Sequence, residues 1–277
     1  MKTFHLASDC IAWRKNIVHT VGFVPTMGAL HAGHISLIKA SKKNCKKTIV
    51  SIYINPAQFS PEEDFGSYPK TIKEDLKILK SLNVDAVFLP SDNEIYPKNK
   101  PDNFKYKNSL FKKLEGKSRP HFFYGVTKVV SKLFNIVNPT HTFFGEKDAQ
   151  QSRIINRMIK DLNYNIRFIS CPTVRNENGL ALSSRNNYLS LSEQKQAGII
   201  YRGLKLIEAS IKKGNTNVDQ LKKVFTSMIN KNHSIRVDYI SIACNETLEE
   251  LTIWSENSLI SVAVFYKNVR LIDNIVV

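Results

Sequence analysis

The sequence predicts an α/β protein with a doubly wound parallel sheet over residues 1–172 and a smaller α+β domain over residues 173–277. Strand-like apolar runs alternate with segments of helical period up to Pro172, and beyond it two helical stretches precede consecutive strand-like runs. Strands that alternate with helices pair in parallel, because each helix crosses back over the sheet before the next strand begins. A chain of 277 residues is also long enough for two domains.

The elements of the first domain follow from residue type and spacing. Runs of β-branched and aromatic residues bounded by Gly, Pro or Asn predict strands, and apolar residues three and four apart predict helices. The carboxyl ends of parallel strands meet at one sheet edge, where α/β folds bind ligands. The expected strands are 20–25, 48–55, 84–89, 140–144 and 166–171, and the expected helices are 35–44, 71–82, 126–137 and 148–162.

The second domain begins with a polar segment, residues 173–190, which has no regular apolar period and contains Gly179. The strand-like runs come after the helical stretches and do not alternate with them, which fits a smaller α+β domain. The expected helices lie near 192–213 and 218–230, and the expected strands are 237–243, 259–266 and 270–272.

Composition excludes several classes of protein. Hydrophobic residues make up 42% of the chain and aromatic residues 10%, which argues against disorder. The longest apolar run, residues 259–266, is too short for a membrane helix of about 18 residues. The N-terminal residues lack the apolar core of a secretory signal, so we expect a cytoplasmic protein without a membrane partner. The four cysteines show no CxxC spacing, which predicts free thiols rather than a zinc site.

The formal net charge of +16 raises the question of a nucleic-acid partner. The excess is spread as lysine pairs on helical patterns, which is typical of a solvated surface or of a field that attracts small anions. An RNA-binding module would interleave basic residues with stacking aromatics, and residues 104–113 are only a weak instance of this pattern. We therefore expect no nucleic-acid partner.

The turn after the strand 20–25 is the strongest candidate site. His31 and His34 are three residues apart, so they project from one face of a first helical turn. The glycines of the turn let backbone approach a ligand, and the helix N-terminus offers N–H groups to phosphate. A histidine pair at this spacing, read alone, is more often a capping or surface feature. The residues of this turn are Met27, Gly28, Ala29, Leu30, His31, Ala32, Gly33 and His34.

Three further polar groups have a plausible binding role. The amides of Asn55 and Gln58, directly after a strand, suit the hydroxyl and carboxylate groups of a small substrate. A charged turn leads into a helix that carries Gln151, and two hydroxyls beside a guanidinium form a candidate anion clamp. Each group read alone is also explained by turn, capping or linker chemistry. The charged turn is Gly145, Glu146, Lys147 and Asp148, and the clamp is Leu182, Ser183, Ser184 and Arg185.

The HAGH sequence at residues 31–34 resembles the HIGH motif of the adenylate-forming nucleotidyltransferases. Within that superfamily, the order and spacing of six segments are similar to those of the pantoate–β-alanine ligase family. The similarity runs from Val21 to Asn274. The six segments are VPTMGALHAGH, VSIYINPAQF, YPKT, FGEKDAQQ, GLALSSRN and RLIDN.

This resemblance implies a Rossmann-like ATP domain, a smaller lid domain and a homodimer. It also implies that ATP, Mg²⁺, pantoate and β-alanine bind, and that pantoate is activated as an acyl adenylate. A different enzyme with the HIGH motif, one that transfers a nucleotide to a phosphorylated alcohol, would share His31 and His34 but need no amine acceptor. The glutamine pair, which suits a polyol with a carboxylate, favours the ligase.

The resemblance also assigns roles to individual residues. His34 is the catalytic residue, Gln58 and Gln151 bind pantoate, Gln58 also binds β-alanine, and Asn55 supports them. Asp75 is a magnesium ligand by family position, although read alone it is a solvent-facing helix carboxylate. ATP is bound by the turn 27–34 and by Gly145, Glu146, Lys147, Asp148, Val174, Leu182, Ser183, Ser184 and Arg185.

The segment 119–126 departs from the family pattern. The chain reads RPHFFYGV where family members often read RPGHFRGV, so His121 is displaced by one position and Tyr124 replaces an arginine. We therefore assign no catalytic role to His121.

Overall fold

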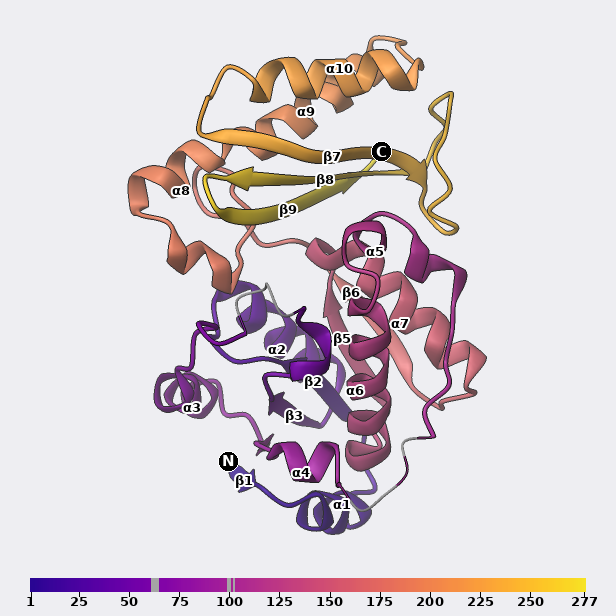
Figure 1. Ribbon diagram of the computed structural model, residues 1–277. Helices are drawn as coiled ribbons and strands as arrows, with labels where there is room; N and C mark the ends of the chain where they lie inside the picture. The colour runs from indigo at the N-terminus through magenta and orange to yellow at the C-terminus, as the bar shows by residue number, and fades with distance from the viewer. Residues whose placement is uncertain (61–64, 99–100, 102) are drawn as a thin grey trace. The chain divides into compact units, whose positions relative to one another are not determined.

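The computed structural model describes residues 1–60, 65–98, 101 and 103–277 of the chain. These residues divide into two units, which are shown in Figure 1. The larger unit contains Met1–Gly145 and Gln151–Cys171, and the smaller unit contains Glu146–Gln150 and Pro172–Val277. No helix in the described part of the chain is long and apolar enough to cross a membrane.

The larger unit is built on a parallel sheet, as the sequence predicts. Its described residues form six strands in the order β1-β4-β3-β2-β5-β6, and every neighbouring pair is parallel. The strands are β1 (Lys2–Phe4), β2 (Val21–Thr26), β3 (Lys47–Ile52), β4 (Ala86–Phe88), β5 (His141–Gly145) and β6 (Arg167–Cys171). The helices are α1 (Ala7–Lys15), α2 (Ala32–Asn44), α3 (Ile72–Ser81), α4 (Asp92–Ile95), α5 (Glu115–Ser118), α6 (Phe122–Val137) and α7 (Ala149–Asp161), of which the first two residues of α7 belong to the smaller unit.

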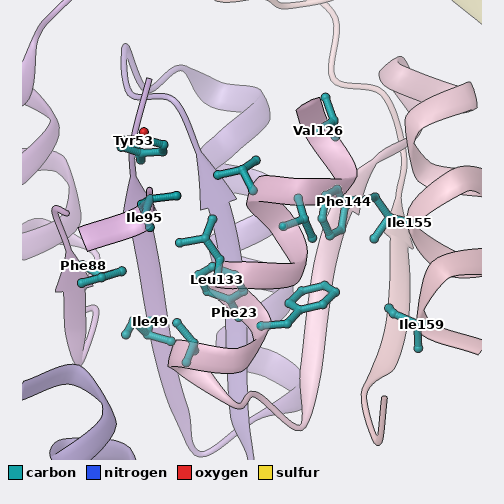
Figure 2. Close-up of a cluster of buried hydrophobic side chains, with 14 of the residues drawn as sticks. Phe23, Ile49, Tyr53, Phe88, Ile95, Val126, Leu133, Phe144, Ile155 and Ile159 are labelled. Carbon is teal, nitrogen blue, oxygen red and sulfur yellow. The ribbon is translucent and has the colours of Figure 1, made fainter. Parts of the chain in front are cut away.

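Alternate residues of each strand point to opposite faces of the sheet. Helices cover both faces. Phe23 of β2 packs on one face with Leu133 of α6, in the cluster shown in Figure 2. The next residue, Val24, packs on the other face with Leu37 and Ile38 of α2. The sheet is therefore doubly wound, as predicted.

Helix α6 illustrates how sequence period produces this core. Its buried residues Val126, Val130, Leu133 and Val137 recur at spacings of three and four, which places them on one face of the helix. The helix ends at Asn138, whose φ of 43° and ψ of 58° are left-handed, and Pro139 cannot continue it.

The smaller unit contains an antiparallel sheet of order β7-β8-β9, formed by β7 (Ile235–Cys244), β8 (Ser258–Tyr266) and β9 (Val269–Val276). Helices α8 (Leu191–Ala197), α9 (Ile199–Lys212) and α10 (Val218–Ile229) contribute to its apolar core. The helix expected near 192–213 is thus two helices that meet at Gly198. A Cβ there would lie 2.1 Å from the backbone oxygen of Asn178, so this junction requires glycine.

All four cysteines are free thiols, as predicted. Cys10, Cys45 and Cys171 are buried, whereas Cys244 is partly exposed. Burial raises the pKa of Cys10 to about 12 and that of Cys45 to about 11. The Thr247 side chain donates a hydrogen bond that lowers the pKa of Cys244.

Candidate active site

The predicted binding residues of the larger unit follow the carboxyl ends of adjacent strands. Residues 27–31 follow β2, Asn55 follows β3, and Gly145 ends β5. Strand β2 pairs with β3 on one side and with β5 on the other. The chain runs from β2 through β3 to β4 on the first side, and then crosses to β5 and β6 on the second side, so the strand order reverses between β2 and β5. Open α/β sheets bind ligands at such a switch point. The turn predicted from the sequence therefore lies where the topology favours a site.

His31 and His34 cap the N-terminus of α2 reciprocally. The backbone N–H of Gly33 donates to His31 Nδ1 at 3.1 Å, and the backbone N–H of His31 donates to His34 Nδ1 at 3.4 Å. Because both Nδ1 atoms accept, each neutral ring carries its proton on Nε2. The ring centroids are 4.2 Å apart, so the two imidazoles lie side by side at the start of α2. Capping and phosphate binding are thus compatible roles of the same two side chains.

Asp75 holds the turn before these histidines. Its Oδ2 accepts from the Ala29 N–H at 3.0 Å and its Oδ1 from the Leu30 N–H at 2.8 Å, and Thr71 Oγ1 donates to Oδ2 at 3.3 Å. Gly28 and Ala29 have φ values of 85° and 50°, so the carboxylate fixes a turn in a conformation that few residues adopt.

Asp75 is only 1% exposed, so it is not the solvent-facing carboxylate that its helix position allows. Its two oxygens already accept hydrogen bonds inside the unit, and this arrangement does not fit an open magnesium site. The described residues also contain no group of three or more His, Cys, Asp or Glu side chains that could hold a metal ion. The geometry assigns Asp75 to the backbone of the turn.

Gln58 is oriented by a chain of side-chain hydrogen bonds. Tyr96 Oη donates to Asn55 Oδ1 at 2.8 Å, and Asn55 Nδ2 donates to Gln58 Oε1 at 3.2 Å. With its oxygen so engaged, Gln58 directs its Nε2 donors to the other side, where Nε2 lies 2.9 Å from Met27 Sδ. Asn55 Nδ2 also donates to the Gly125 carbonyl at 3.1 Å. Asn55 is therefore a buried side chain that holds Gln58 in place.

The segment that departs from the family pattern packs against this chain of hydrogen bonds. Arg119 Nη2 donates to the Gln58 carbonyl at 3.3 Å, and a Cβ at Gly125 would lie 2.0 Å from the Ala57 carbonyl oxygen. His121 is exposed, and Tyr124 Oη donates to the Phe104 carbonyl at 2.7 Å. Arg119 and Gly125, which match the family pattern, thus support the backbone at Gln58, whereas the divergent Tyr124 is engaged elsewhere.

The charged turn is divided between the two units. Gly145 belongs to the larger unit, where its carbonyl accepts from Ser152 Oγ at 3.0 Å, and Gln151 is half-buried in the first turn of α7. Glu146, Lys147 and Asp148 form the 3₁₀ turn η3 (Glu146–Asp148) of the smaller unit. Lys147 Nζ lies 3.4 Å from Asp148 Oδ1.

The predicted clamp is an ordered turn within the smaller unit. Ser183 Oγ accepts from the Arg185 N–H at 3.3 Å and caps the 3₁₀ helix η4 (Ser184–Tyr188), while Ser184 is buried. The Leu182 N–H donates to the Val174 carbonyl at 2.9 Å, so two predicted nucleotide ligands are neighbours here. The adjacent serines therefore have different roles, and the Ser183 hydroxyl already accepts a capping hydrogen bond.

Comparison with known proteins gives a consistent result along the chain. The family described as pantoate-beta-alanine ligase matches residues 2–276. This chain belongs to the pantoate-beta-alanine ligase family. A pantothenate synthetase of Caldicellulosiruptor saccharolyticus is 46% identical over 99% of this chain and 97% of the relative. One of Acetivibrio thermocellus is 45% identical over 100% of this chain and 99% of the relative.

Solved structures of pantoate-beta-alanine ligases share the fold. The crystal structure of pantothenate synthetase from Thermus thermophilus has a TM-score of 0.93 and 36% identity, and the match covers 99% of both chains. The ligase from Francisella tularensis, complexed with beta-gamma ATP and beta-alanine, has a TM-score of 0.80 and 36% identity, with 100% of this chain and 97% of that chain covered. The parallel sheet and the smaller antiparallel sheet are therefore those of the family.

Sequence reasoning missed several residues that support the candidate site of this pantoate-beta-alanine ligase. Tyr96 and Arg119 act on Asn55 and Gln58 from 41 and 61 residues away along the chain. Asn274 donates to the carbonyl of Glu146 across 128 residues. No local spacing signals such contacts. The burial of Asp75 did have a signal, because it lies four residues before the apolar Leu79 on the same face of α3.

Proposed function

We propose that this chain condenses pantoate with β-alanine to give pantothenate, at the expense of ATP. In the first step a pantoate carboxylate oxygen attacks the α-phosphorus, and the bond from that phosphorus to pyrophosphate breaks. In the second step the β-alanine nitrogen attacks the acyl carbon and loses a proton, and the carbon–oxygen bond to AMP breaks. Pantoyl adenylate is the intermediate that joins the two steps.

The observation that carries the proposal is the placement of two unlike groups at one sheet edge. Paired histidine donors at a helix N-terminus follow β2, and a supported pair of amides follows the adjacent strand β3. The first group suits phosphate oxygens, and the second suits a small polyol with a carboxylate. A reaction between a nucleotide and such an acid needs both groups side by side.

His34 is the proposed catalytic residue, acting with His31 on the phosphates of ATP. Charge develops on phosphate oxygens as the bond to pyrophosphate breaks, and donors already fixed in place stabilise it without reorganisation. The reciprocal cap fixes both rings before ATP arrives, because each Nδ1 accepts a backbone N–H. Stabilisation of this charge is expected to outweigh proton transfer by His34.

Gln58 and Gln151 are the proposed pantoate ligands, and Gln58 also faces β-alanine in this assignment. The chain from Tyr96 through Asn55 to Gln58 Oε1 supports a donor role, because it engages the oxygen. One Nε2 hydrogen of Gln58 donates to Met27 Sδ, and the other is proposed to bind the substrate. A donor pair suits the pantoate carboxylate and hydroxyl oxygens.

ATP is the proposed ligand of residues 27–34, of Gly145 and of the smaller unit's Glu146, Lys147, Asp148, Val174, Leu182, Ser183, Ser184 and Arg185. Magnesium enters the proposal as the ion that neutralises phosphate charge, and its assignment to Asp75 rests on the resemblance alone. A homodimer in the cytoplasm, without a nucleic-acid partner, is likewise proposed from sequence. Light scattering at micromolar protein and a gel-shift assay with RNA test the oligomer and the absent partner.

The proposal is tested by incubating the protein with ATP, Mg²⁺ and pantoate, with and without β-alanine, and separating the products by chromatography. We expect AMP rather than ADP, and pantothenate only when β-alanine is present. Release of ADP would contradict adenylate formation. A phosphorylated alcohol as the only productive acceptor would instead support the alternative nucleotidyltransferase.

A further inference from the structure

A buried ion pair joins Arg175 to Asp273, which lies in the middle of β9 in the smaller unit. Arg175 Nη1 donates to Asp273 Oδ2 at 2.6 Å, and Arg175 Nη2 donates to Asp273 Oδ1 at 2.8 Å. Asp273 is 4% exposed. Burial raises the pKa of this carboxyl, and the Arg175 guanidinium and the Asn274 N–H act against that rise. The two-pronged geometry holds the arginine in one orientation.

The same arginine reaches the segment that carries Val174 and Leu182. Its Nη1 also donates to the Gly179 carbonyl at 3.2 Å, and its guanidinium lies 3.7 Å from the centre of the Tyr201 ring. Arg175 further pairs with Ala181 in an isolated antiparallel bridge. The loop from residue 174 to 182 is therefore closed on itself and fixed to β9 through one guanidinium.

The residue after Asp273 holds the other predicted nucleotide segment of this unit. Asn274 Nδ2 donates to the carbonyls of Glu146 and Lys147, both at 2.9 Å, so its amide group contacts both. Asn274 is 7% exposed, and its own carbonyl lies 3.4 Å from Arg175 Nη2. Fixing two successive carbonyls fixes the peptide planes around Lys147, and with them the direction in which its side chain leaves the turn.

We propose that Arg175, Asp273 and Asn274 form a clasp that positions both ATP-binding segments of the smaller unit. This inference rests on the proposed function, since ATP is the ligand assigned to those segments. The three are positioning residues, because they act through Lys147 and the loop 174–182. The clasp fixes the turn 146–148 and the loop 174–182 to the same strand, β9, before ATP arrives, so less ordering is needed on binding.

The test replaces Asn274, because this change leaves the Arg175–Asp273 ion pair intact. Asn274→Ala is expected to raise the Kd for ATP about tenfold, the effect of two lost hydrogen bonds, and to change the Kd for pantoate less than about twofold. Calorimetry on the intact protein measures both constants without turnover. Hydrogen exchange should become faster at residues 146–149.

Two further variants separate positioning from general stability. If Asn274 acts through Lys147, then in a Lys147→Ala background Asn274→Ala should lose most of its effect on ATP. Arg175→Lys keeps the positive charge but loses the two-pronged contact, and should speed exchange at both 146–149 and 176–182. Arg175→Lys also tests the proposal if Asn274→Ala folds poorly.

Arg270→Ala is the matched control. Arg270 lies on the same strand β9 and is paired with Asp238 of β7 at 2.8 Å, and neither residue belongs to the two ATP-binding segments. Its replacement should leave the ATP Kd and the exchange of residues 146–149 unchanged.

The clasp is overturned if Asn274→Ala leaves the ATP Kd within twofold of wild type, or if Arg270→Ala weakens ATP equally. A wild-type protein that binds ATP but forms no pantothenate overturns the proposed function alone. One that binds no ATP overturns both.

Discussion

Replacement of Asp75 by Asn distinguishes two roles for this carboxylate. By family resemblance Asp75 is a magnesium ligand, whereas its geometry makes it the tether of the turn before His31. Asn has nearly the same volume and retains one oxygen. The asparagine side chain can therefore accept a hydrogen bond from only one of the two backbone N–H groups, of Ala29 or of Leu30. Its own NH₂ group then faces the other N–H, so that two donors meet and the backbone N–H has no acceptor.

The size of the effect follows from these contacts. A hydrogen bond to a charged group contributes about 1.5–3 kcal/mol, and a buried donor left without an acceptor costs about 1–3 kcal/mol. Asp75→Asn weakens one charged contact and orphans one backbone N–H, so we expect a loss of about 2–4 kcal/mol in the free energy of unfolding. At about 2–4 °C per kcal/mol for a unit of this size, the Tm should fall by roughly 4–16 °C.

The assay is thermal denaturation in EDTA, together with calorimetric titration of ATP in EDTA. The tether role predicts a lower Tm and weaker ATP binding without any metal, because the turn that carries His31 loosens. Glu74→Gln is the control, since Glu74 is exposed beside Asp75 on α3 and should leave the Tm unchanged. A normal Tm and normal ATP binding in EDTA, with only a higher magnesium requirement for turnover, would refute the tether.

Three other changes test separate parts of the account. His34→Ala should lower turnover about 10²–10³-fold through loss of a preorganised donor, measured as steady-state AMP release; a large fall in Tm with unchanged turnover would make it a core histidine. Tyr96→Phe should raise the KM for pantoate several-fold with little change for ATP, and Tyr53→Phe, which loses a bond to Asp92, is its control. Iodoacetamide at pH 8 should label Cys244 before Cys10, because the lowered pKa of Cys244 gives it more thiolate. Mass spectrometry after brief labelling measures the order, and earlier labelling of Cys10 would contradict the prediction.

Much of the fold was predictable because most strands of the parallel sheet are apolar runs that alternate with helical segments. Strand β1 was not predicted, since it has three residues and is held by pairing with β4. Helix α1 was also missed, because Cys10 is its only buried residue among those described and it lacks an apolar stripe. The break at Gly198 depends on the Asn178 carbonyl, a tertiary contact that helical period cannot reveal.

The candidate site was predictable where its residues are neighbours in sequence. The turn of His31 and His34 is such a case, because glycines, histidines and the end of a strand occur together. The residues that orient this chemistry are distant in sequence. Tyr96 acts on Asn55 across 41 residues, and Arg175 pairs with Asp273 across 98. Such pairs come together only in the folded structure, so no local sequence pattern indicates them.

Isotope exchange between labelled pyrophosphate and ATP tests the central claim most directly. The first step as proposed is reversible and needs pantoate but no β-alanine, so the wild-type protein with Mg²⁺ should move label from pyrophosphate into ATP only when pantoate is added. His34→Ala should slow this exchange as strongly as it slows turnover. Exchange without pantoate, or no exchange in a preparation that still forms pantothenate, would contradict a pantoyl adenylate formed at this site.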